Sequence, residues 1–379
     1  MKFVYSFIVF CLIFSMQIFG QKVTLDAGVP QISGENPYKD NTYQLINSKF
    51  ALPNRDVVET PDCAHPDFGQ HIRQEWDAEL NSYVFAFYMH RTPDNDRCLP
   101  DITDRQRNEI KTYDGSPENL KATLGETVTY KWKFKLDAGF VPSRNFCHIH
   151  QIKAVGGSEE SMPLITFCPR KGSGGNPDKF QLMYAENSTQ SSIYEVNLSE
   201  FKGHWADVTE VITYGEKNTG GNYSVEIKRI NDGAVIFSYS NNNIRTWKTD
   251  ATFLRPKWGI YRSIADATTT LRDERVLFNN FSIEEGIPSS AAQATENTLQ
   301  LAIVPNPAKG TAFVHYELPK SSHVKIELFN SKGQRIAVLV NDFKPEGKHF
   351  AETKKQTTGN YLIRLQADNQ VVAEKFIQQ

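Results

Sequence analysis

The sequence carries almost no net charge, because 42 Lys and Arg residues are matched by 44 Asp and Glu residues in a chain of 379. No overall field draws such a chain toward a polyanion, so we do not expect a nucleic-acid partner, and any attraction for an acidic ligand must come from a local basic cluster. The sequence also lacks a Cys-x-x-Cys pair, which argues against a cysteine-type zinc site. Long amphipathic helical patterns are absent too, and short alternating segments with 12% aromatic residues favour a strand-rich core.

One long hydrophobic run stands at the amino terminus, from Phe3 to Phe19, preceded by Lys2 and followed by the small residue Gly20. This order predicts a signal peptide over residues 1–20. A membrane anchor is the alternative, although the run is near the lower length limit for spanning a bilayer. Cys11 lies inside the run rather than after the expected cut, which argues against a lipoprotein.

Four cysteines remain after cleavage, namely Cys63, Cys98, Cys147 and Cys168. An even number of cysteines in an exported chain indicates disulfides, and four cysteines allow three pairings. We favour the two local pairings, Cys63–Cys98 and Cys147–Cys168, because they close short loops.

A composition break at residues 286–298 divides the chain into a body over residues 21–285 and a tail over residues 299–379. The break is small, polar and without periodicity, as expected of a linker. The tail alternates over His323–Asn330 and Asn360–Ala367, with turn signals between such runs. It is therefore predicted to form a small β-sandwich.

Three stretches of the tail, VPNPAKG, VKIELFNSKGQRI and GNYLIRLQADNQVVAEKFI, resemble the C-terminal sorting domain of the type IX secretion system. The resemblance covers the whole tail. It implies export across an outer membrane, with the secretion machinery as a partner and a secreted or cell-surface location. An accessory sugar-binding sandwich is the alternative.

The body is also predicted to be mostly β-structure. Alternating runs occupy Thr127–Leu136, Tyr223–Ile230 and Val276–Ile283, and an Asn-Asp-Gly turn precedes the run AVIFSYS. Many short strands in a body of this length indicate an all-β fold, a two-sheet jelly roll. One curved sheet of such a fold can offer a polar concave face to a long polymer.

Three segments of the body place charged residues at positions where a strand ordinarily has uncharged side chains. In the first, the period of two puts Arg105, Arg107, Glu109 and Lys111 on one face. Such a basic row could bind acidic sugar groups while Glu109 holds the arginines. A solvated edge strand with salt bridges is the alternative interpretation.

The second segment is HIHQIK, in which Gln151 and Lys153 share one face and His148 and His150 the other. Two histidines at this spacing raise the question of a metal site, but no acidic or cysteine ligand follows closely. A buried, hydrogen-bonded histidine is a more ordinary role for at least one of them.

The third segment is RPKWGIYRS, in which Arg255, Lys257, Gly259 and Tyr261 point the same way. A glycine between large polar side chains leaves open surface where a ligand can approach the backbone. An ordinary strand with an outward tyrosine would give the same letters.

The three segments together supply what β-elimination from a uronate requires. A cation or amide must neutralise the carboxylate, so that charge developing next to it is tolerated. A base must remove the C5 proton, and an acid must protonate the departing O4. Arginine and glutamine suit the first task, a lysine of lowered pKa the second, and a tyrosine the third.

In these segments the body resembles the jelly-roll polysaccharide lyases, a group that includes alginate, glucuronan, heparin and ulvan lyases. Arg107-Asn-Glu109-Ile-Lys111 is similar to the Arg-x-Glu-x-Arg strand of the group, with Lys in the last place. Gln151-Ile-Lys153 is similar to its Gln-x-His strand, with Lys in place of His. The run from Lys257 to Tyr261 matches its Lys-x-Gly-x-Tyr strand, and the resemblance spans residues 60–285.

The resemblance implies a role for each matching residue. Tyr261 falls on the catalytic tyrosine, Arg107 and Gln151 on the carboxylate-neutralising pair, and Lys153 on the base, with His150 in reserve. Ulvan lyases of this fold are the most similar, followed by glucuronan lyases. The expected substrate is therefore ulvan, cut endolytically.

The remaining substrate-binding candidates are grouped around these residues: Arg105, Glu109, His150, Lys257 and Arg255. We expect a monomer that needs no cofactor. A structural calcium ion would suit the fold, but no acidic cluster in the sequence identifies its ligands.

Two rival functions remain open at this point. Glu75-Trp-Asp77-Ala-Glu79 spells a pattern by which some jelly-roll hydrolases place a nucleophile and an acid on one strand, so that Glu75 and Glu79 could hydrolyse a glycoside. A non-catalytic carbohydrate-binding module or adhesin is the second rival, since the fold and the basic groove would serve either.

Overall fold

The computed structural model describes residues 22–32, 39–265, 271–286 and 299–379, apart from residues 319, 332 and 369. The proposed signal peptide and nearly all of the proposed linker lie outside these residues. The chain separates into two compact units, residues 1–288 and 289–379. No helix among the described residues is long and apolar enough to cross a membrane.

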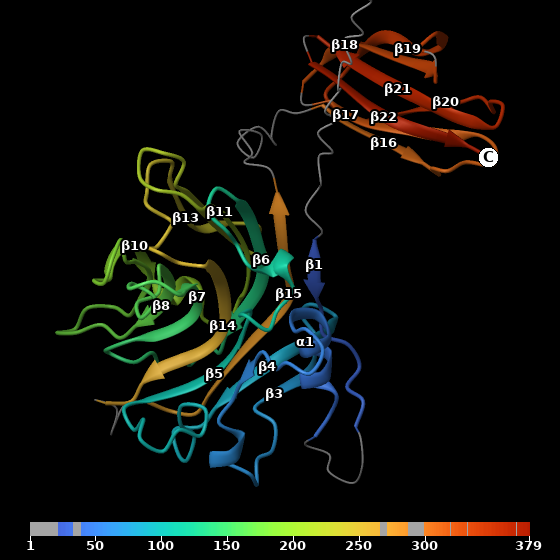
Figure 1. Cartoon of the computed structure of the whole chain (residues 1–379). Coiled ribbons are helices and arrows are strands. Elements are labelled where there is room, and N and C mark those ends of the chain that lie inside the picture. The colour runs from blue at the N-terminus through green and yellow to red at the C-terminus, as the bar shows by residue number, and fades with distance from the viewer. Residues whose placement is uncertain are drawn as a thin grey trace, which may run out of the picture. The chain divides into compact units, whose positions relative to one another are not determined.

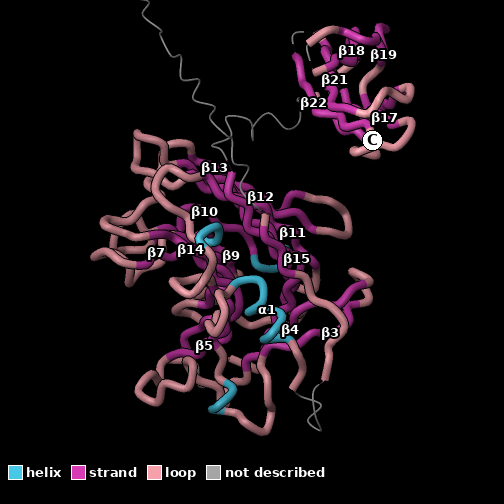
Figure 2. The backbone as a smooth tube through the Cα atoms, turned by 45° about the vertical axis from the view of Figure 1, so that its right-hand side comes forward, coloured by secondary structure: helices cyan, strands magenta, loops and turns pink. Residues whose placement is uncertain are grey.

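The first unit is a sandwich of two antiparallel sheets, as the sequence predicted (Figures 1 and 2). One sheet has the order β13-β12-β11-β6-β15-β4-β3, and β1 pairs with β15. Its strands are β1 (Val23–Leu25), β3 (Ile72–Asp77), β4 (Ser82–Met89), β6 (Thr127–Leu136), β11 (Trp205–Thr213), β12 (Asn222–Arg229), β13 (Val235–Asn241) and β15 (Glu274–Gly286).

The second sheet has the order β10-β9-β8-β7-β14-β5-β2. Its strands are β2 (Val58–Glu59), β5 (Arg105–Lys111), β7 (Cys147–Val155), β8 (Ile165–Arg170), β9 (Lys179–Tyr184), β10 (Ser191–Asn197) and β14 (Phe253–Ser263). The helical segments are short: α1 (Thr42–Phe50), η1 (Asp62–Ala64), η2 (Glu118–Leu120) and η3 (Leu198–Glu200).

Alternating side chains build the core between the sheets. Along β6, Tyr130, Trp132 and Phe134 are buried, whereas Lys131 is exposed. Trp132 meets Trp258 of the opposite sheet with ring centroids 5.8 Å apart. Each fully buried large side chain of this kind contributes about 1.5–3 kcal/mol, so this layer holds the second sheet in place and leaves its other face for polar residues.

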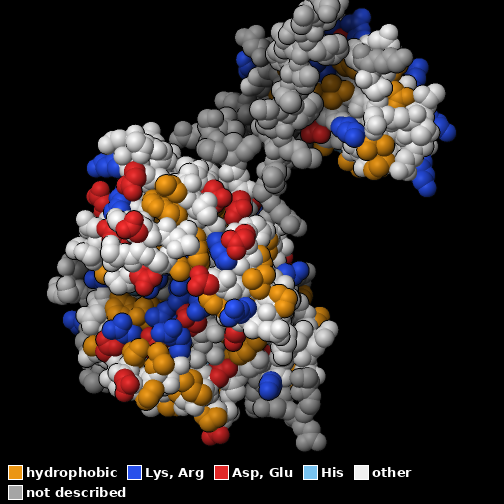
Figure 3. Space-filling view, in the orientation of Figure 1, with side chains coloured by type: hydrophobic (Ala, Val, Ile, Leu, Met, Phe, Trp, Pro, Cys, Tyr) orange, Lys and Arg blue, Asp and Glu red, His pale blue; other side chains and the backbone are white. Residues whose placement is uncertain are grey.

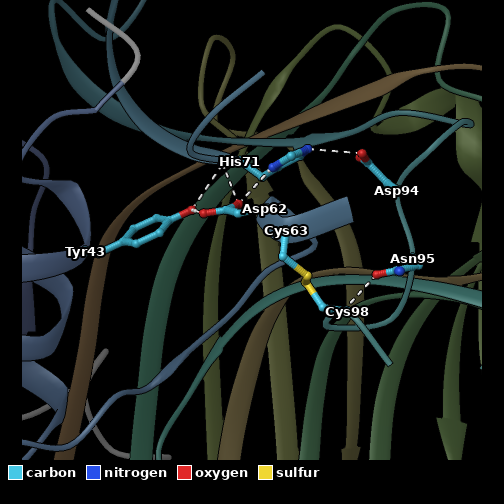
Figure 4. Close-up of a disulfide and its surroundings, with 7 residues drawn as sticks. All are labelled: Tyr43, Asp62, Cys63, His71, Asp94, Asn95 and Cys98. Carbon is cyan, nitrogen blue, oxygen red and sulfur yellow. Dashed lines mark hydrogen bonds and ion pairs between the residues drawn. A yellow bond between two sulfur atoms is a disulfide. The ribbon is translucent and has the colours of Figure 1, made fainter. Parts of the chain in front are cut away.

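The cysteines of the described part of the chain form one bridge rather than two. Cys63 and Cys98 are joined, as predicted, across a sequence separation of 35 (Figure 4). The expected Cys147–Cys168 bridge is wrong, because both residues are buried free thiols. The β7–β8 ladder pairs His150 with Phe167, which offsets the two cysteines instead of setting them opposite each other.

The second unit is a small sandwich of a three-stranded and a four-stranded sheet, of order β16-β17-β20 and β19-β18-β21-β22. Its core contains Val324, Ile326 and Leu328 of β18 and Ile363 and Leu365 of β21. Its strands are β16 (Gln300–Val304), β17 (Ala312–Leu318), β18 (Ser322–Asn330), β19 (Arg335–Lys344), β20 (Gly347–Thr353), β21 (Gly359–Ala367) and β22 (Gln370–Gln378).

Candidate active site

The three charged segments of the body become neighbouring strands, because β14 pairs with β5 on one side and with β7 on the other. Rows of side chains therefore cross the sheet. Tyr261 stands between Arg107 and His148, and Lys257 stands between Lys111 and Gln151. Figure 3 shows Lys and Arg side chains gathered over this part of the body.

A buried charge network lies under these rows. Glu109, with no exposed surface, accepts from Arg107 at 2.6 Å, from Lys257 at 2.8 Å and from the amide of Gln151. Burial alone would raise the pKa of Glu109, but Lys257 and Arg107 outweigh it and lower the pKa to about 2. Burial lowers the pKa of Lys257 to about 8, against the opposing effect of Glu109 and Glu59. Glu109 is thus ionised and paired with both Arg107 and Lys257.

Two acidic residues outside the predicted set complete the network. Asp96 forms an ion pair with Arg107, whose Nε lies 2.9 Å from a carboxylate oxygen. Glu59 forms ion pairs with Lys111 and Lys257, whose Nζ atoms lie 2.9 Å and 2.5 Å from its oxygens. Neither stands in a charged alternating run, because Glu59 belongs to a two-residue strand and Asp96 to a loop. The sequence therefore offered no signal for either.

Tyr261 is held by two arginines. Arg105 donates from Nη1 to the phenol oxygen at 2.9 Å, and the Arg107 guanidinium lies 3.7 Å from the centre of the ring. Because Arg105 uses the oxygen as an acceptor, the phenol hydrogen remains available to a ligand. Most of the donors of Arg107 already bind Glu109 and Asp96. Arg107 therefore has few donors left for a carboxylate ligand, and its main contact is with the Tyr261 ring.

Lys153 lies beside Arg255, its partner across the β7–β14 ladder, and is half-buried. Burial, followed by the charges of Arg255 and Arg107, lowers the pKa of Lys153 below its usual value. Lys153 is five residues further along β7 than His148, roughly 16 Å of strand. Lys153 and Tyr261 therefore stand at opposite ends of the same face, with Gln151 between them.

Several polar atoms on this face lack a hydrogen-bond partner within the described part of the chain. They are Nδ1 of His148, Nε of Arg170, and Nε and Nη1 of Arg255. Buried donors without partners are costly, and a bound anion would satisfy those of Arg170 and Arg255. Arg170, at the end of β8, was not among the predicted residues.

The prediction that His148 and His150 share a face is wrong. His150 is fully buried between the sheets, where it contacts Trp132 and hydrogen-bonds to Glu210 and to the Lys257 carbonyl, each at 2.9 Å. It therefore cannot serve as the reserve base or touch substrate. His148 instead packs on Tyr261, with ring centroids 5.7 Å apart.

A bulge explains this difference. Between Trp258 and Tyr261 β14 advances three residues while β7 advances two, and on β7 the consecutive residues Ile149 and His150 are both buried in the core, so simple alternation fails there. Gly259, at φ 145, sits in the shift, and a Cβ there would lie 2.1 Å from the carbonyl oxygen of Asn108. The glycine was the sequence signal for the bulge. Burial lowers the pKa of His148 to about 4, so its ring is neutral near pH 7.

The hydrolase pattern does not form a carboxylate pair on one strand. β3 ends at Asp77, which leaves Glu79 in the following turn. Glu75 pairs with Arg275 at 2.8 Å and Glu79 with Lys135 at 2.5 Å. Both carboxylates are thus committed to separate ion pairs on the sheet opposite the cationic face.

Comparison with solved structures returns alginate lyases and lectins, among others, at low identity. An alginate lyase from Pseudomonas aeruginosa is 15% identical, with 62% of this chain and 96% of that chain covered and a TM-score of 0.37. An alginate lyase from Corynebacterium sp. is 13% identical, with coverage of 70% and 93% and a TM-score of 0.36. Lectin II from Ulex europaeus is 8% identical, with coverage of 71% and 99% and a TM-score of 0.37.

Curated proteins give no match. Residues 302–379, however, match the family model described as the secretion system C-terminal sorting domain. This match agrees with the resemblance seen in the tail. The protein is therefore secreted, and it resides outside the cell or on the cell surface.

Proposed function

We propose that the protein is an endolytic polysaccharide lyase that cleaves a uronate-containing glycan by β-elimination and leaves 4,5-unsaturated uronate ends. The observation that carries the proposal is the shared sheet face of Lys153, Gln151 and Tyr261, surrounded by arginines with unsatisfied donors. A glycan carrying carboxylates would satisfy these donors along its length.

In this mechanism Tyr261 donates its proton to the departing O4, while Arg105 and Arg107 hold the ring in place. Gln151 and the arginine donors neutralise the substrate carboxylate, which makes the C5 proton removable. The resemblance assigns the removal of that proton to Lys153, whose pKa is lowered by burial and by the charges of Arg255 and Arg107. C5 and the carbon that bears O4 are adjacent atoms of one sugar ring, however, and the roughly 16 Å of strand between Lys153 and His148, the β7 residue paired with Tyr261, is long for a base that must act on the same ring as the tyrosine.

His148 is a second candidate for the base, and a specific observation favours it. Its ring packs directly on Tyr261, it is neutral near pH 7, and its Nδ1 has no partner among the described residues. Lys153 stands at the far end of the Gln151 row, whereas His148 adjoins Tyr261, so His148 and the tyrosine are close enough to act on one sugar ring. The two candidates differ in position enough to be separated by mutation.

We further propose ulvan as the substrate, because HIHQIK and RPKWGIYRS resemble the ulvan lyases of this fold most. Glucuronan and heparin-type glycans are the next candidates. The test is to incubate the purified protein with ulvan, glucuronan, alginate and heparin, and to follow the ultraviolet absorbance of the unsaturated uronate. Binding without this chromophore would indicate a binding module, and new reducing ends without it would indicate a hydrolase.

Variants assign the roles. Tyr261→Phe and Lys153→Met should each lower kcat by about 10²–10⁴-fold, the usual contribution of a general acid or base. Lys131→Met, on the exposed face of the other sheet, is the matched control and should leave kcat unchanged. Near-normal turnover in Lys153→Met, together with loss in His148→Ala, would transfer the base to His148.

A further inference from the structure

A second cluster of polar side chains lies away from the cationic rows, where the loops before β3 and after β4 meet. His65, His71, His90 and Asp94 each offer one ligand atom, and these atoms all lie within 4.8 Å of one another. Oδ1 of Asp94 is 3.2 Å from Nδ1 of His65 and 3.1 Å from Nε2 of His71, and Oδ2 is 3.1 Å from Nδ1 of His90. Three imidazoles thus surround one carboxylate.

The burial of these four residues is graded. The side chains of Asp94 and His71 are fully buried, whereas those of His65 and His90 are 24% and 16% exposed. A buried carboxylate surrounded by imidazoles is costly unless it is neutralised, and a cation would do this for all four groups at once. The partly exposed histidines leave a route by which an ion could enter.

His71 is oriented by a second layer of contacts (Figure 4). Its Nδ1 lies 2.8 Å from Asp62 Oδ1, and Asp62 in turn accepts from the phenol of Tyr43 at 2.8 Å. A histidine whose Nδ1 donates to a carboxylate presents a lone pair at Nε2, the atom that faces Asp94. Carboxylate–histidine pairs of this kind commonly support metal ligands.

A rigid frame holds the loops that carry the ligands. The Cys63–Cys98 disulfide joins the segment before His65 to the segment after Asp94. The Phe68 ring packs on His90 with centroids 4.2 Å apart and on His71 at 4.8 Å. The ligands are thereby held near their positions before any ion arrives, which reduces the entropic cost of binding.

We propose that His65, His71, His90 and Asp94 bind one divalent transition-metal ion, with zinc as the preferred ion. Three imidazole nitrogens and one carboxylate oxygen are a ligand set that suits tetrahedral zinc and offers too few oxygens for calcium or magnesium. The site ties together loops contributed by separate parts of the chain, so its expected role is structural. The proposal is independent of the glycan chemistry at the cationic rows.

The test uses the full exported chain without a histidine tag. The protein is treated with a chelator, incubated with zinc chloride and gel-filtered, and its metal content is measured by mass spectrometry. We expect about one zinc per chain, and a rise in Tm of about 5 °C or more when zinc is present well above its Kd. Cobalt chloride should give the visible absorption of tetrahedral cobalt.

The test variant combines His65→Ala with His90→Ala, because both of these side chains are partly exposed. The control is His204→Ala, which changes a histidine outside the cluster. The double variant should keep the circular dichroism spectrum of the wild type but retain less than about a tenth of an equivalent of zinc, whereas His204→Ala should retain the full equivalent. Calcium should give no Tm rise.

Zinc content below about a tenth of an equivalent in the wild type would overturn the proposal, and the cluster would then be a hydrogen-bonded network around Asp94. Equal zinc content in the wild type and the double variant would overturn it as well, because the ion would then sit elsewhere. Lyase activity is not a readout in either case.

Discussion

Replacing Glu109 with glutamine tests the buried charge network most directly. The change keeps the shape of the side chain and removes its charge, which leaves Arg107 and Lys257 facing a neutral amide. The pKa of Glu109, lowered from 4.5 to about 2, corresponds to about 3 kcal/mol of stabilisation, since each tenfold change in proton affinity is worth about 1.4 kcal/mol. Loss of one partner from a buried ion pair typically costs about 3–5 kcal/mol, which agrees.

The pH dependence of this contribution has a definite sign. A carboxyl group whose pKa is depressed by folding stabilises the protein above its unfolded pKa and loses that contribution as the pH falls through the folded pKa. For Glu109 the contribution should be complete above about pH 4.5 and be lost toward about pH 2. The difference in unfolding free energy between the wild type and Glu109→Gln should therefore narrow as the medium is acidified.

Urea unfolding from pH 7 to pH 3, followed by tryptophan fluorescence, measures this difference. Glu79→Gln is the matched control, because Glu79 pairs with Lys135 at the surface, and such a pair contributes less than about 1 kcal/mol. A loss below about 1 kcal/mol in Glu109→Gln at pH 7, or a difference that does not change with pH, would refute the description of Glu109 as an ionised bridge.

Three further predictions follow from the same structure. Gly259→Ala should lower the unfolding free energy by about 2–3 kcal/mol in urea titrations and distort the site. The reason is that its Cβ would lie 2.1 Å from the Asn108 carbonyl oxygen at a φ of 145. An unchanged urea midpoint would contradict this prediction. Cys63→Ser with Cys98→Ser should cost about 3–4 kcal/mol by loop-closure entropy, seen as a lower Tm under non-reducing conditions only. If Lys153 is the base, kcat/KM should rise with pH through a pKa below 10.5, and Lys153→Met should abolish that limb.

Local patterns predicted the strands well because alternation is a local property. β6 was expected over Thr127–Leu136 and has these bounds. The three charged segments lie side by side because strands that bury one face in a common core expose the other on a common surface. The tail strands at Ser322–Asn330 and Gly359–Ala367 also agree with the sequence within one residue.

What escaped the sequence depends on contacts between distant parts of the chain. The β14–β7 register shifts at a bulge, and Ile149 and His150 are both buried, so the strict alternation that placed His148 with His150 does not hold. Asp96 reaches Arg107 from a loop whose path no periodicity describes. The histidine cluster draws His65 and His90 from two separate loops, and their approach follows from the folded chain rather than from residue spacing.

The Cys63–Cys98 bridge has a consequence for the timing of maturation. Cys98 stands two residues after Asp96, which fixes the Nε of Arg107, so the crosslink steadies the anchor of the tyrosine-bearing end of the site. Disulfides do not persist in a reducing cytosol. A newly made chain therefore carries an unlocked version of this loop, and the site reaches its final geometry only after the protein has left the compartment where it was synthesised.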